Sequence, residues 1–201
     1  MNYSMLKSKT RIILLPLVNL FAKLNVNPSI LTLVGFVINC LAAYLFALGF
    51  FRWAGLVLIL ASIFDAIDGE VARKNNRVTD SGAFLDSVID RYSEFIVLLG
   101  IFIHYIKFGS TFFIFVTLFS ILGSLMVSYT RARAEGLGIK CSIGLFDRPF
   151  RVTIIVIGAL LGRTIFGYFL LALAFLTQLT SLHRIIYIEK KLTNIQRRKN
   201  V

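Results

Sequence analysis

Negative charge is scarce in this chain, which has ten Asp and Glu against 22 Lys and Arg in 201 residues and a formal net charge of +12. The basic residues do not form one stripe with exposed aromatic side chains, which argues against a nucleic-acid partner. Only two cysteines occur, and Cys40 and Cys141 lack metal-site spacing. One is expected in a membrane span and the other in a loop, so a disulfide between them is implausible. We also find no low-complexity linker and no fixed-period repeat, which favours one main domain.

Hydrophobic residues are abundant instead, at 57% of the chain with a mean hydropathy of +0.80. Soluble domains have roughly 45–50% apolar residues, so this composition indicates a protein of the bilayer. A spanning helix needs about 20 mainly apolar residues. We therefore expect an all-α integral membrane protein with six transmembrane helices. The expected spans are 28–50, 51–69, 84–106, 111–130, 149–162 and 164–188.

The two ends of the chain are basic. Residues 1–26 place Lys7, Lys9, Arg11 and Lys23 among Leu, Ile and Phe, and no cleavage site of a signal peptide is evident. This pattern predicts an amphipathic helix lying in the headgroup layer, interrupted at Pro16. Residues 27–190 would form the membrane domain, and residues 191–201 a basic cytoplasmic tail.

Positive charge alternates along the connections between the expected spans. The first, third and fifth connections hold one cation each, Arg52, Lys107 and Arg163. The other two connections and the C-terminal stretch hold Arg73, Lys74, Arg77, Arg131, Arg133, Lys140, Arg148, Arg151, Arg184, Lys190, Lys191, Arg197, Arg198 and Lys199. By the positive-inside rule, this alternation predicts a multi-pass protein of the cell membrane with both termini in the cytoplasm. The basic tails would contact anionic membrane lipids.

Seven of the ten acidic residues gather within thirty positions: Asp65, Asp68, Glu70, Asp80, Asp86, Asp90 and Glu94. Asp65 and Asp68 share a helix face, and Asp86 and Asp90 share another. If those faces meet, four carboxylates converge, and like charges so close need compensation. All-oxygen ligands favour Mg²⁺, Mn²⁺ or Ca²⁺ over Zn²⁺. The other three acids fall outside this spacing and are expected to be solvated.

A cation held by few protein ligands keeps coordination sites for a substrate phosphate. Gly69 and Gly82 would let a nucleotide or diphosphate approach the backbone, and Arg73 could pair with phosphate. One carboxylate could then act as general base on an attacking hydroxyl. Two functions remain open from these residues: an enzyme that breaks a diphosphate at the cytoplasmic interface, and a cation transporter with an acidic binding site.

The acidic stretch "DAIDGEVARKNNRVTDSGAFLDSVID" resembles the signature of the CDP-alcohol phosphotransferases. It fits the pattern D-x2-D-G-x2-A-R-x8-G-x3-D-x3-D at Asp65, Asp68, Gly69, Ala72, Arg73, Gly82, Asp86 and Asp90. The expected six-span layout with an interfacial helix is also similar to that family. The resemblance implies that a substituted phosphate passes from a CDP-linked lipid to an alcohol, releasing CMP. It also implies a homodimer.

The resemblance further assigns roles to single residues. Asp65, Asp68, Asp86 and Asp90 would hold Mg²⁺, with Mn²⁺ as an alternative, and Asp90 would also be the base. The expected CDP-lipid contacts are Ser29, Thr32, Gly69, Arg73, Thr79 and Gly82. Ser29 stands where related bacterial enzymes have Asp.

A second informative stretch, "SYTRARAEGLGIKCSIGLFDRPFR", supplies Arg131, Arg133, Arg148 and Arg151, which suit recognition of an acceptor phosphate. It resembles the branch that uses 1L-myo-inositol 1-phosphate, comprising phosphatidylinositol-phosphate and archaetidylinositol-phosphate synthases, and is more similar to the archaeal form. Phe150 replaces the Glu of many relatives. Glycerol 3-phosphate remains an alternative acceptor, although "SVIDR" replaces the "PxADK" of that branch. The lipid anchor, diacylglycerol or archaeol, stays open.

Overall fold

All regular secondary structure in the described part of the chain is helical. A computed structural model describes residues 14–141, 143–144 and 146–199. After a short helix, Leu14–Lys23, come α2 (Pro28–Leu48), α3 (Phe51–Lys74), α4 (Asp80–Lys107), α5 (Thr111–Gly136), α6 (Arg148–Leu161) and α7 (Arg163–Lys199). No strand occurs within these ranges, which confirms the all-α prediction.

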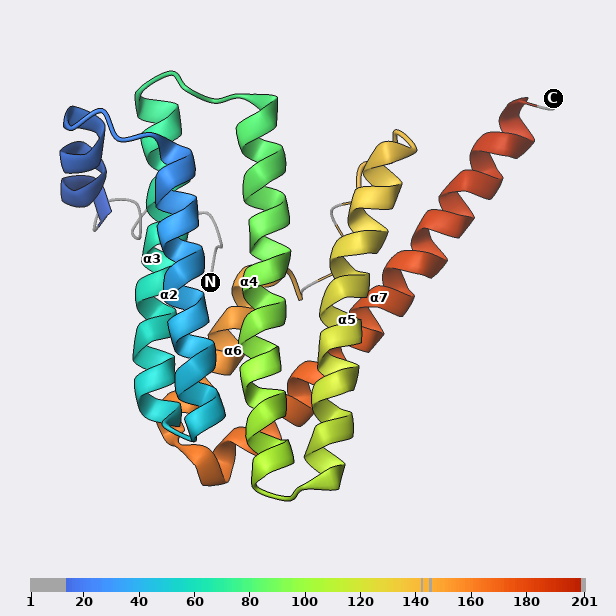
Figure 1. Cartoon of the computed structure of the whole chain (residues 1–201). Coiled ribbons are helices and arrows are strands. Elements are labelled where there is room, and N and C mark those ends of the chain that lie inside the picture. Colours follow the sequence, from blue (N-terminus) through green and yellow to red (C-terminus); the bar gives the residue numbers. More distant parts are fainter. Residues whose placement is uncertain (1–13, 142, 145, 200–201) are drawn as a thin grey trace.

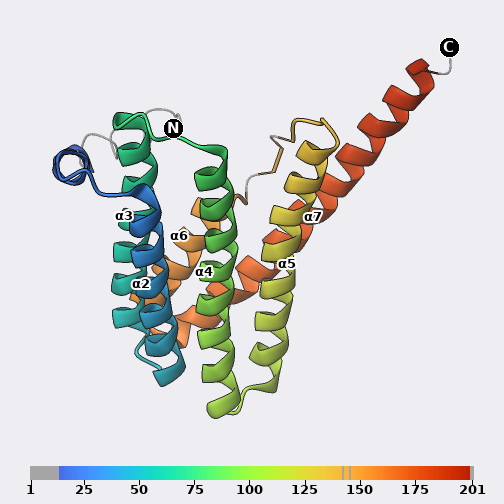
Figure 2. The same cartoon turned by 45° about the horizontal axis from the view of Figure 1, so that its top comes forward.

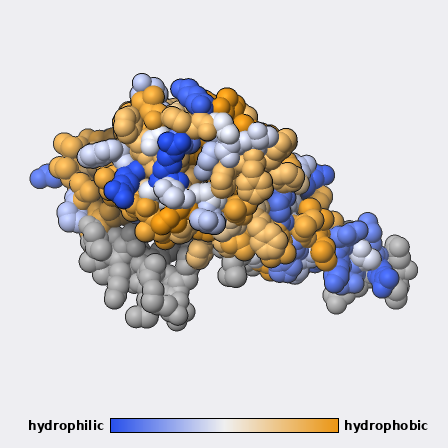
Figure 3. All heavy atoms as spheres, turned by 90° about the horizontal axis from the view of Figure 1, so that it is seen from below, coloured by the Kyte–Doolittle hydropathy of each residue, from blue (hydrophilic) through white to orange (hydrophobic). Residues whose placement is uncertain are grey.

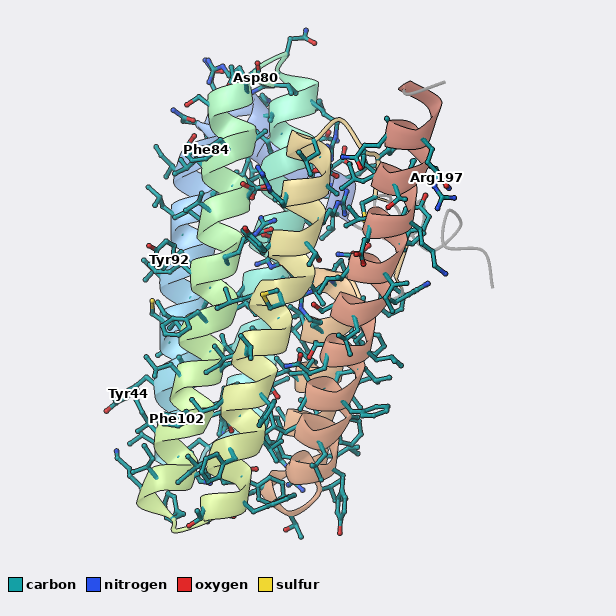
Figure 4. The ribbon with its side chains drawn as sticks, turned by 90° about the vertical axis from the view of Figure 1, so that its right-hand side faces the viewer. Tyr44, Asp80, Phe84, Tyr92, Phe102 and Arg197 are labelled. Carbon is teal, nitrogen blue, oxygen red and sulfur yellow. The ribbon has the colours of Figure 1, made fainter. Side chains whose placement is uncertain are left out.

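Three of the described helices are long and apolar enough to cross a membrane, judged by length and composition. They are Pro28–Leu48, Thr111–Gly136 and Arg163–Arg197. Large apolar side chains also cover much of the outer surface, as Tyr44, Phe84 and Tyr92 do along one edge (Figure 4). Viewed from below, hydrophobic surface surrounds a small hydrophilic group, while the C-terminal end of α7 is hydrophilic (Figure 3). These features agree with a membrane protein.

The helices form a bundle whose two ends differ in charge. Helices α2, α3 and α4 lie side by side, α5 packs along α7, and α6 packs against α3 and α7 (Figures 1 and 2). The α3–α4 connection, the start of the α5–α6 loop and the C-terminal end of α7 lie at the upper end in Figure 1, and the loop then runs down to the start of α6. The helix ends that carry Arg52, Lys107 and Arg163, next to the three other connections, lie at the lower end. The basic connections therefore share one end of the molecule.

Local signals in the sequence fix where the helices near this upper end begin. The Asn27 side chain accepts a hydrogen bond from the Ser29 amide at 3.1 Å, and Pro28 occupies the first turn of α2. The Thr79 hydroxyl accepts from the Gly82 amide at 3.0 Å and caps α4. Both caps satisfy amides that have no partner within the helix.

Small residues allow the helices to approach closely. A Cβ built on Gly100 of α4 would lie 2.2 Å from the Ala43 carbonyl oxygen of α2. A Cβ on Gly123 of α5 would lie 2.2 Å from the Thr177 hydroxyl of α7. Such contacts are typical of helix pairs in membranes, where packing rather than water expulsion drives association. The main buried core lies beside them and includes Phe46, Phe51, Leu98, Phe166 and Leu170.

The helices differ in extent from the segments expected from hydropathy. Helix α3 continues past residue 69 to Lys74, and α4 begins at Asp80 rather than residue 84. Helix α7 runs through residue 188 to Lys199, because "EKKLTNIQRRK" contains good helix formers and no breaker. The hydropathy limits thus mark where the apolar composition ends, whereas the helices run on into polar sequence.

The predicted N-terminal helix is described only from residue 14, and residues 1–13 lie outside the described part. The described portion, Leu14–Lys23, packs Leu14 and Val18 against Ile67 and Val71 of α3. Both cysteines are free, as the sequence predicted.

Candidate active site

Three of the four motif carboxylates meet between α3 and α4. Asp65 of α3 and Asp86 and Asp90 of α4 each offer one oxygen, and these oxygens all lie within 4.8 Å of one another. All three side chains are partly buried. A cation with octahedral oxygen ligands at about 2.1 Å holds them about 3–4 Å apart, so small side-chain adjustments suffice. The donor set therefore fits a hard divalent cation.

The fourth carboxylate, Asp68, lies apart from this group and is directed toward α2. It is 5% exposed and accepts a hydrogen bond of 2.7 Å from the Thr32 hydroxyl. That hydroxyl also contacts the Pro28 carbonyl at 3.2 Å. Asp68 is thus fixed by a partner 36 residues away in sequence, which the spacing of the motif does not reveal.

A cavity of about 830 Å³, here called the larger cavity, opens beside these carboxylates. It is formed by the ends of α2, α3 and α4 that face the upper end of the bundle, and Asp68 and Asp86 line it. All six residues predicted to contact the CDP-lipid also line it: Ser29, Thr32, Gly69, Arg73, Thr79 and Gly82. The structure thus brings these six residues together around one cavity.

Besides Thr32, the side chains of Thr79 and Arg73 make contacts of their own. Thr79 uses its hydroxyl as the cap of α4, so its position is fixed by the helix start. The Arg73 guanidinium contacts Glu70 at 2.8 Å, but its side chain is 55% exposed. An exposed ion pair of this kind is weak, so a phosphate could compete for the guanidinium.

A second cavity of about 270 Å³, the smaller cavity, lies on the other side of the cluster. Asp90 lines it, together with Glu94, Arg131, Asp147, Arg148, Arg151 and Arg184. Three of the four arginines predicted to bind the acceptor therefore line this cavity, namely Arg131, Arg148 and Arg151. The fourth, Arg133, is exposed and lines neither cavity.

Arg148 connects the smaller cavity to the carboxylate cluster. Its Nη1 atom donates to both oxygens of Asp65 at 2.9 Å and lies 2.6 Å from Asp90. Burial alone would lower the pKa of Arg148, but the Asp65 and Asp90 carboxylates outweigh this effect and raise its pKa above the usual value. The side chain therefore remains a cation.

Arg151 is buried one helical turn beyond Arg148. Its Nε and Nη2 atoms donate to the two oxygens of Glu94 at 2.5 and 2.7 Å, and the two side chains are 1% and 6% exposed. Glu94 was expected to be solvated, and this expectation is wrong. The carboxylate lies one turn beyond Asp90 on α4, where an arginine 57 residues away compensates its charge.

Arg184, which the charge pattern places only among the C-terminal cations, is a buried part of the smaller cavity. Its guanidinium donates to the Ile143 carbonyl at 2.8 Å, the Val127 carbonyl at 2.7 Å and Asp147 at 2.7 Å. Asp147 also lies 4.0 Å from Arg131. A signal was available, because Arg184 interrupts an apolar stretch of a predicted span, where charged residues are costly.

The chain is similar to known proteins over most of its length. A family profile described as CDP-alcohol phosphatidyltransferase matches residues 25–185. An archaetidylinositol phosphate synthase of Pyrococcus horikoshii is 38% identical over 172 residues, covering 85% of this chain and 88% of that protein.

Two solved structures of Mycobacterium tuberculosis phosphatidylinositol phosphate synthase (PgsA1) are also similar, each at 26% identity over 86% of this chain with a TM-score of 0.78. One has CDP-DAG bound, and 92% of its chain is covered. The other is in complex with manganese and citrate, and 87% of its chain is covered.

Proposed function

Because this chain belongs to the CDP-alcohol phosphatidyltransferase family, we propose that it transfers the phosphatidyl-type or archaetidyl group of a CDP-linked lipid to 1L-myo-inositol 1-phosphate and releases CMP. The single observation that carries this proposal is a carboxylate cluster lying between two cavities of different character. Relatives named archaetidylinositol and phosphatidylinositol phosphate synthases support the choice of acceptor.

The larger cavity is proposed to bind the CDP part of the lipid substrate. Gly69 and Gly82 leave space on its wall, and Arg73 offers an exposed guanidinium for a phosphate. Asp68 and Asp86 face the same space, so a diphosphate bound there would lie beside carboxylates that need a divalent cation. The presence of CDP-DAG in a structure similar to this one supports this assignment.

The smaller cavity is proposed to bind the phosphate of the acceptor. Arg131 and Arg148 line it with exposed or partly exposed guanidinium groups, and arginine suits a phosphate because its donors form a planar fork. Arg133 lies on the exposed surface of α5. We therefore rank it below Arg131 and Arg148 as an acceptor ligand.

The chemistry would take place where the two cavities meet. Asp65, Asp86 and Asp90 would hold Mg²⁺ or Mn²⁺, which supplies positive charge to the diphosphate when bound. Asp68 would join them as a fourth ligand by turning away from Thr32. Asp90 would accept the proton of the acceptor hydroxyl, whose oxygen forms a new bond to the lipid-side phosphorus. The bond from that phosphorus to the bridging oxygen breaks, and CMP leaves with that oxygen. Arg148, beside Asp90, would hold the acceptor in position relative to the CDP-lipid.

We further propose the complete membrane arrangement expected from the sequence. It has six spans, an interfacial helix within residues 1–26, a membrane domain over residues 27–190 and a basic tail over residues 191–201. Both termini and the site would face the cytoplasm, which the gathering of Lys and Arg connections at the upper end supports. A homodimer is inferred from the family resemblance alone.

An acceptor panel with radiolabelled CDP-lipid tests the function. Purified protein should release CMP from CDP-diacylglycerol or CDP-archaeol only when Mg²⁺ or Mn²⁺ and inositol 1-phosphate are both present. Equal or faster turnover with glycerol 3-phosphate, serine or free inositol would reject the acceptor assignment. Metal flux into protein-containing vesicles without any CMP release would instead support the transporter alternative.

A further inference from the structure

Two ion pairs join α6 to α4, and they lie about one helical turn apart along both helices. Arg148 and Arg151 are three residues apart on α6, and Asp90 and Glu94 are four residues apart on α4. Arg148 contacts Asp90 at 2.6 Å, whereas Arg151 contacts Glu94 at 2.5 and 2.7 Å. The pairs have the same chemistry, but they differ in burial and in the number of donors already used.

Arg151 has almost no hydrogen-bonding capacity left for a ligand. Besides both oxygens of Glu94, it donates through Nη1 to the Phe146 carbonyl at 2.9 Å and through Nη2 to the Ser128 hydroxyl at 3.4 Å. Four of the five N–H groups of a guanidinium are thus engaged. At 1% exposure, the side chain cannot exchange these partners for a phosphate without leaving Glu94 buried and unpaired.

Arg148 has the opposite properties. Its ion contacts run through Nη1 alone, its buried Nε has no hydrogen-bond partner among the described residues, and its side chain is 22% exposed. It is therefore the arginine of α6 with donors available to a substrate. Because Arg148 and Arg151 lie three residues apart at the start of α6, the contacts that anchor Arg151 also fix the helical turn that carries Arg148.

The contacts of Arg151 hold the start of α6 from three sides. Glu94 belongs to α4, Ser128 belongs to α5, and Phe146 belongs to the loop that leads into α6. Helix α6 is short, at 14 residues, and packs mainly against α3 and α7. The Glu94–Arg151 pair thus links its first turn to the two helices on the other side of the smaller cavity.

We propose that Glu94 and Arg151 are positioning residues that hold the Arg148 guanidinium at the junction of the two cavities, and that Arg151 does not contact the acceptor. This inference rests on the proposed function, because it assigns the acceptor phosphate to Arg148. Misplacement of a binding group by about 1 Å can reduce turnover by about 100-fold. Loss of the pair should therefore impair acceptor use selectively.

The test uses the full-length protein and replaces both partners with apolar residues of similar length, Glu94→Leu with Arg151→Met. Such replacement of a buried ion pair is commonly neutral or stabilising, so this variant is expected to fold. We expect the KM for inositol 1-phosphate to rise by about tenfold or more, with the KM for the CDP-lipid unchanged. Calorimetry with inorganic phosphate should show a parallel loss of affinity, whether or not turnover is measured.

Two further variants separate geometry from stability. Arg151→Lys keeps the charge but cannot form the bidentate contact, so it should also raise the acceptor KM selectively. Leu98→Ala creates a cavity on α4, one turn beyond Glu94, and should lower the unfolding temperature without changing the ratio of the two KM values.

The proposal would be overturned if the folded double variant kept the wild-type acceptor KM and phosphate affinity. If the double variant does not fold, wild-type values in Arg151→Lys would overturn it. A parallel rise of both KM values, matched by Leu98→Ala, would also overturn it. Failure of the proposed function would appear separately, as wild-type protein that releases no CMP with inositol 1-phosphate, and the phosphate calorimetry would still decide the role of the pair.

Discussion

Replacing Asp90 by asparagine tests whether its carboxylate is the base at the junction of the two cavities. Asp90 lines the smaller cavity and lies 2.6 Å from Arg148 Nη1. The amide side chain introduced in Asp90→Asn could still coordinate a cation through its oxygen, but it cannot accept a proton from the acceptor hydroxyl. Arg148 would keep its contacts to Asp65 at 2.9 Å, so the local arrangement should persist.

The expected fall in kcat of Asp90→Asn follows from the two proposed roles of the Asp90 side chain, general base and metal ligand. A positioned general base contributes about 10²–10⁴ in rate, which corresponds to about 2.7–5.4 kcal/mol of activation free energy. The three other motif carboxylates remain in Asp90→Asn, and Asp65 and Asp86 still approach each other. We therefore expect kcat to fall by about 100-fold or more, while metal binding is retained.

The assay measures CMP release at saturating CDP-lipid and acceptor, together with Mn²⁺ binding by electron paramagnetic resonance. Asp80→Asn is the matched control, because Asp80 is exposed in the first turn of α4 and lines neither cavity (Figure 4). That variant should keep wild-type turnover. Near-normal kcat in Asp90→Asn would remove Asp90 from the base role. Loss of Mn²⁺ binding together with loss of turnover would show that the variant fails through metal binding, which would refute the expectation that metal binding is retained.

Three further results are expected. Gly100→Ala should destabilise the protein by about 1–3 kcal/mol or more, measured by thermal unfolding, because the new Cβ would lie 2.2 Å from the Ala43 carbonyl; Gly136→Ala, which meets nothing within 4 Å, should not. Thr32→Val removes the 2.7 Å hydrogen bond to Asp68 and should raise the KM for the CDP-lipid by about tenfold, leaving the acceptor KM unchanged. Chelation should abolish CMP release, and Mg²⁺ or Mn²⁺ but not Zn²⁺ should restore it.

The sequence predicted the family and the helical class well, because both depend on local information. The fixed spacing of the motif places Asp86 and Asp90 on one face of α4, and no partner outside the motif is needed to see this. The match of the family profile over residues 25–185 confirms the resemblance. Caps such as Thr79 are also readable, since their partner lies three residues away.

Contacts between distant residues could not be read in the same way. Spacing assigns Asp68 to a helix face, but only the fold shows that Thr32 binds it. Likewise, Glu94 has an acidic side chain next to polar sequence, and nothing local indicates that Arg151 neutralises it. Arg184 was grouped with the tail because charge counts along the chain do not distinguish a buried guanidinium from a solvated one.

The packing of helix α7 limits where residues can be inserted into the chain or deleted from it. It is a single helix of 37 residues, about 55 Å long, that extends past α5 at its C-terminal end (Figure 1). Thr177 packs against Gly123 of α5, and two turns later Arg184 donates to the Val127 carbonyl of the same helix. One inserted residue between positions 177 and 184 would rotate the arginine by about 100° and turn it away from the smaller cavity. Ile188 and Leu192 of α7 also pack against the cluster of Ala134, Ile139 and Cys141, so the helical phase is fixed up to Leu192.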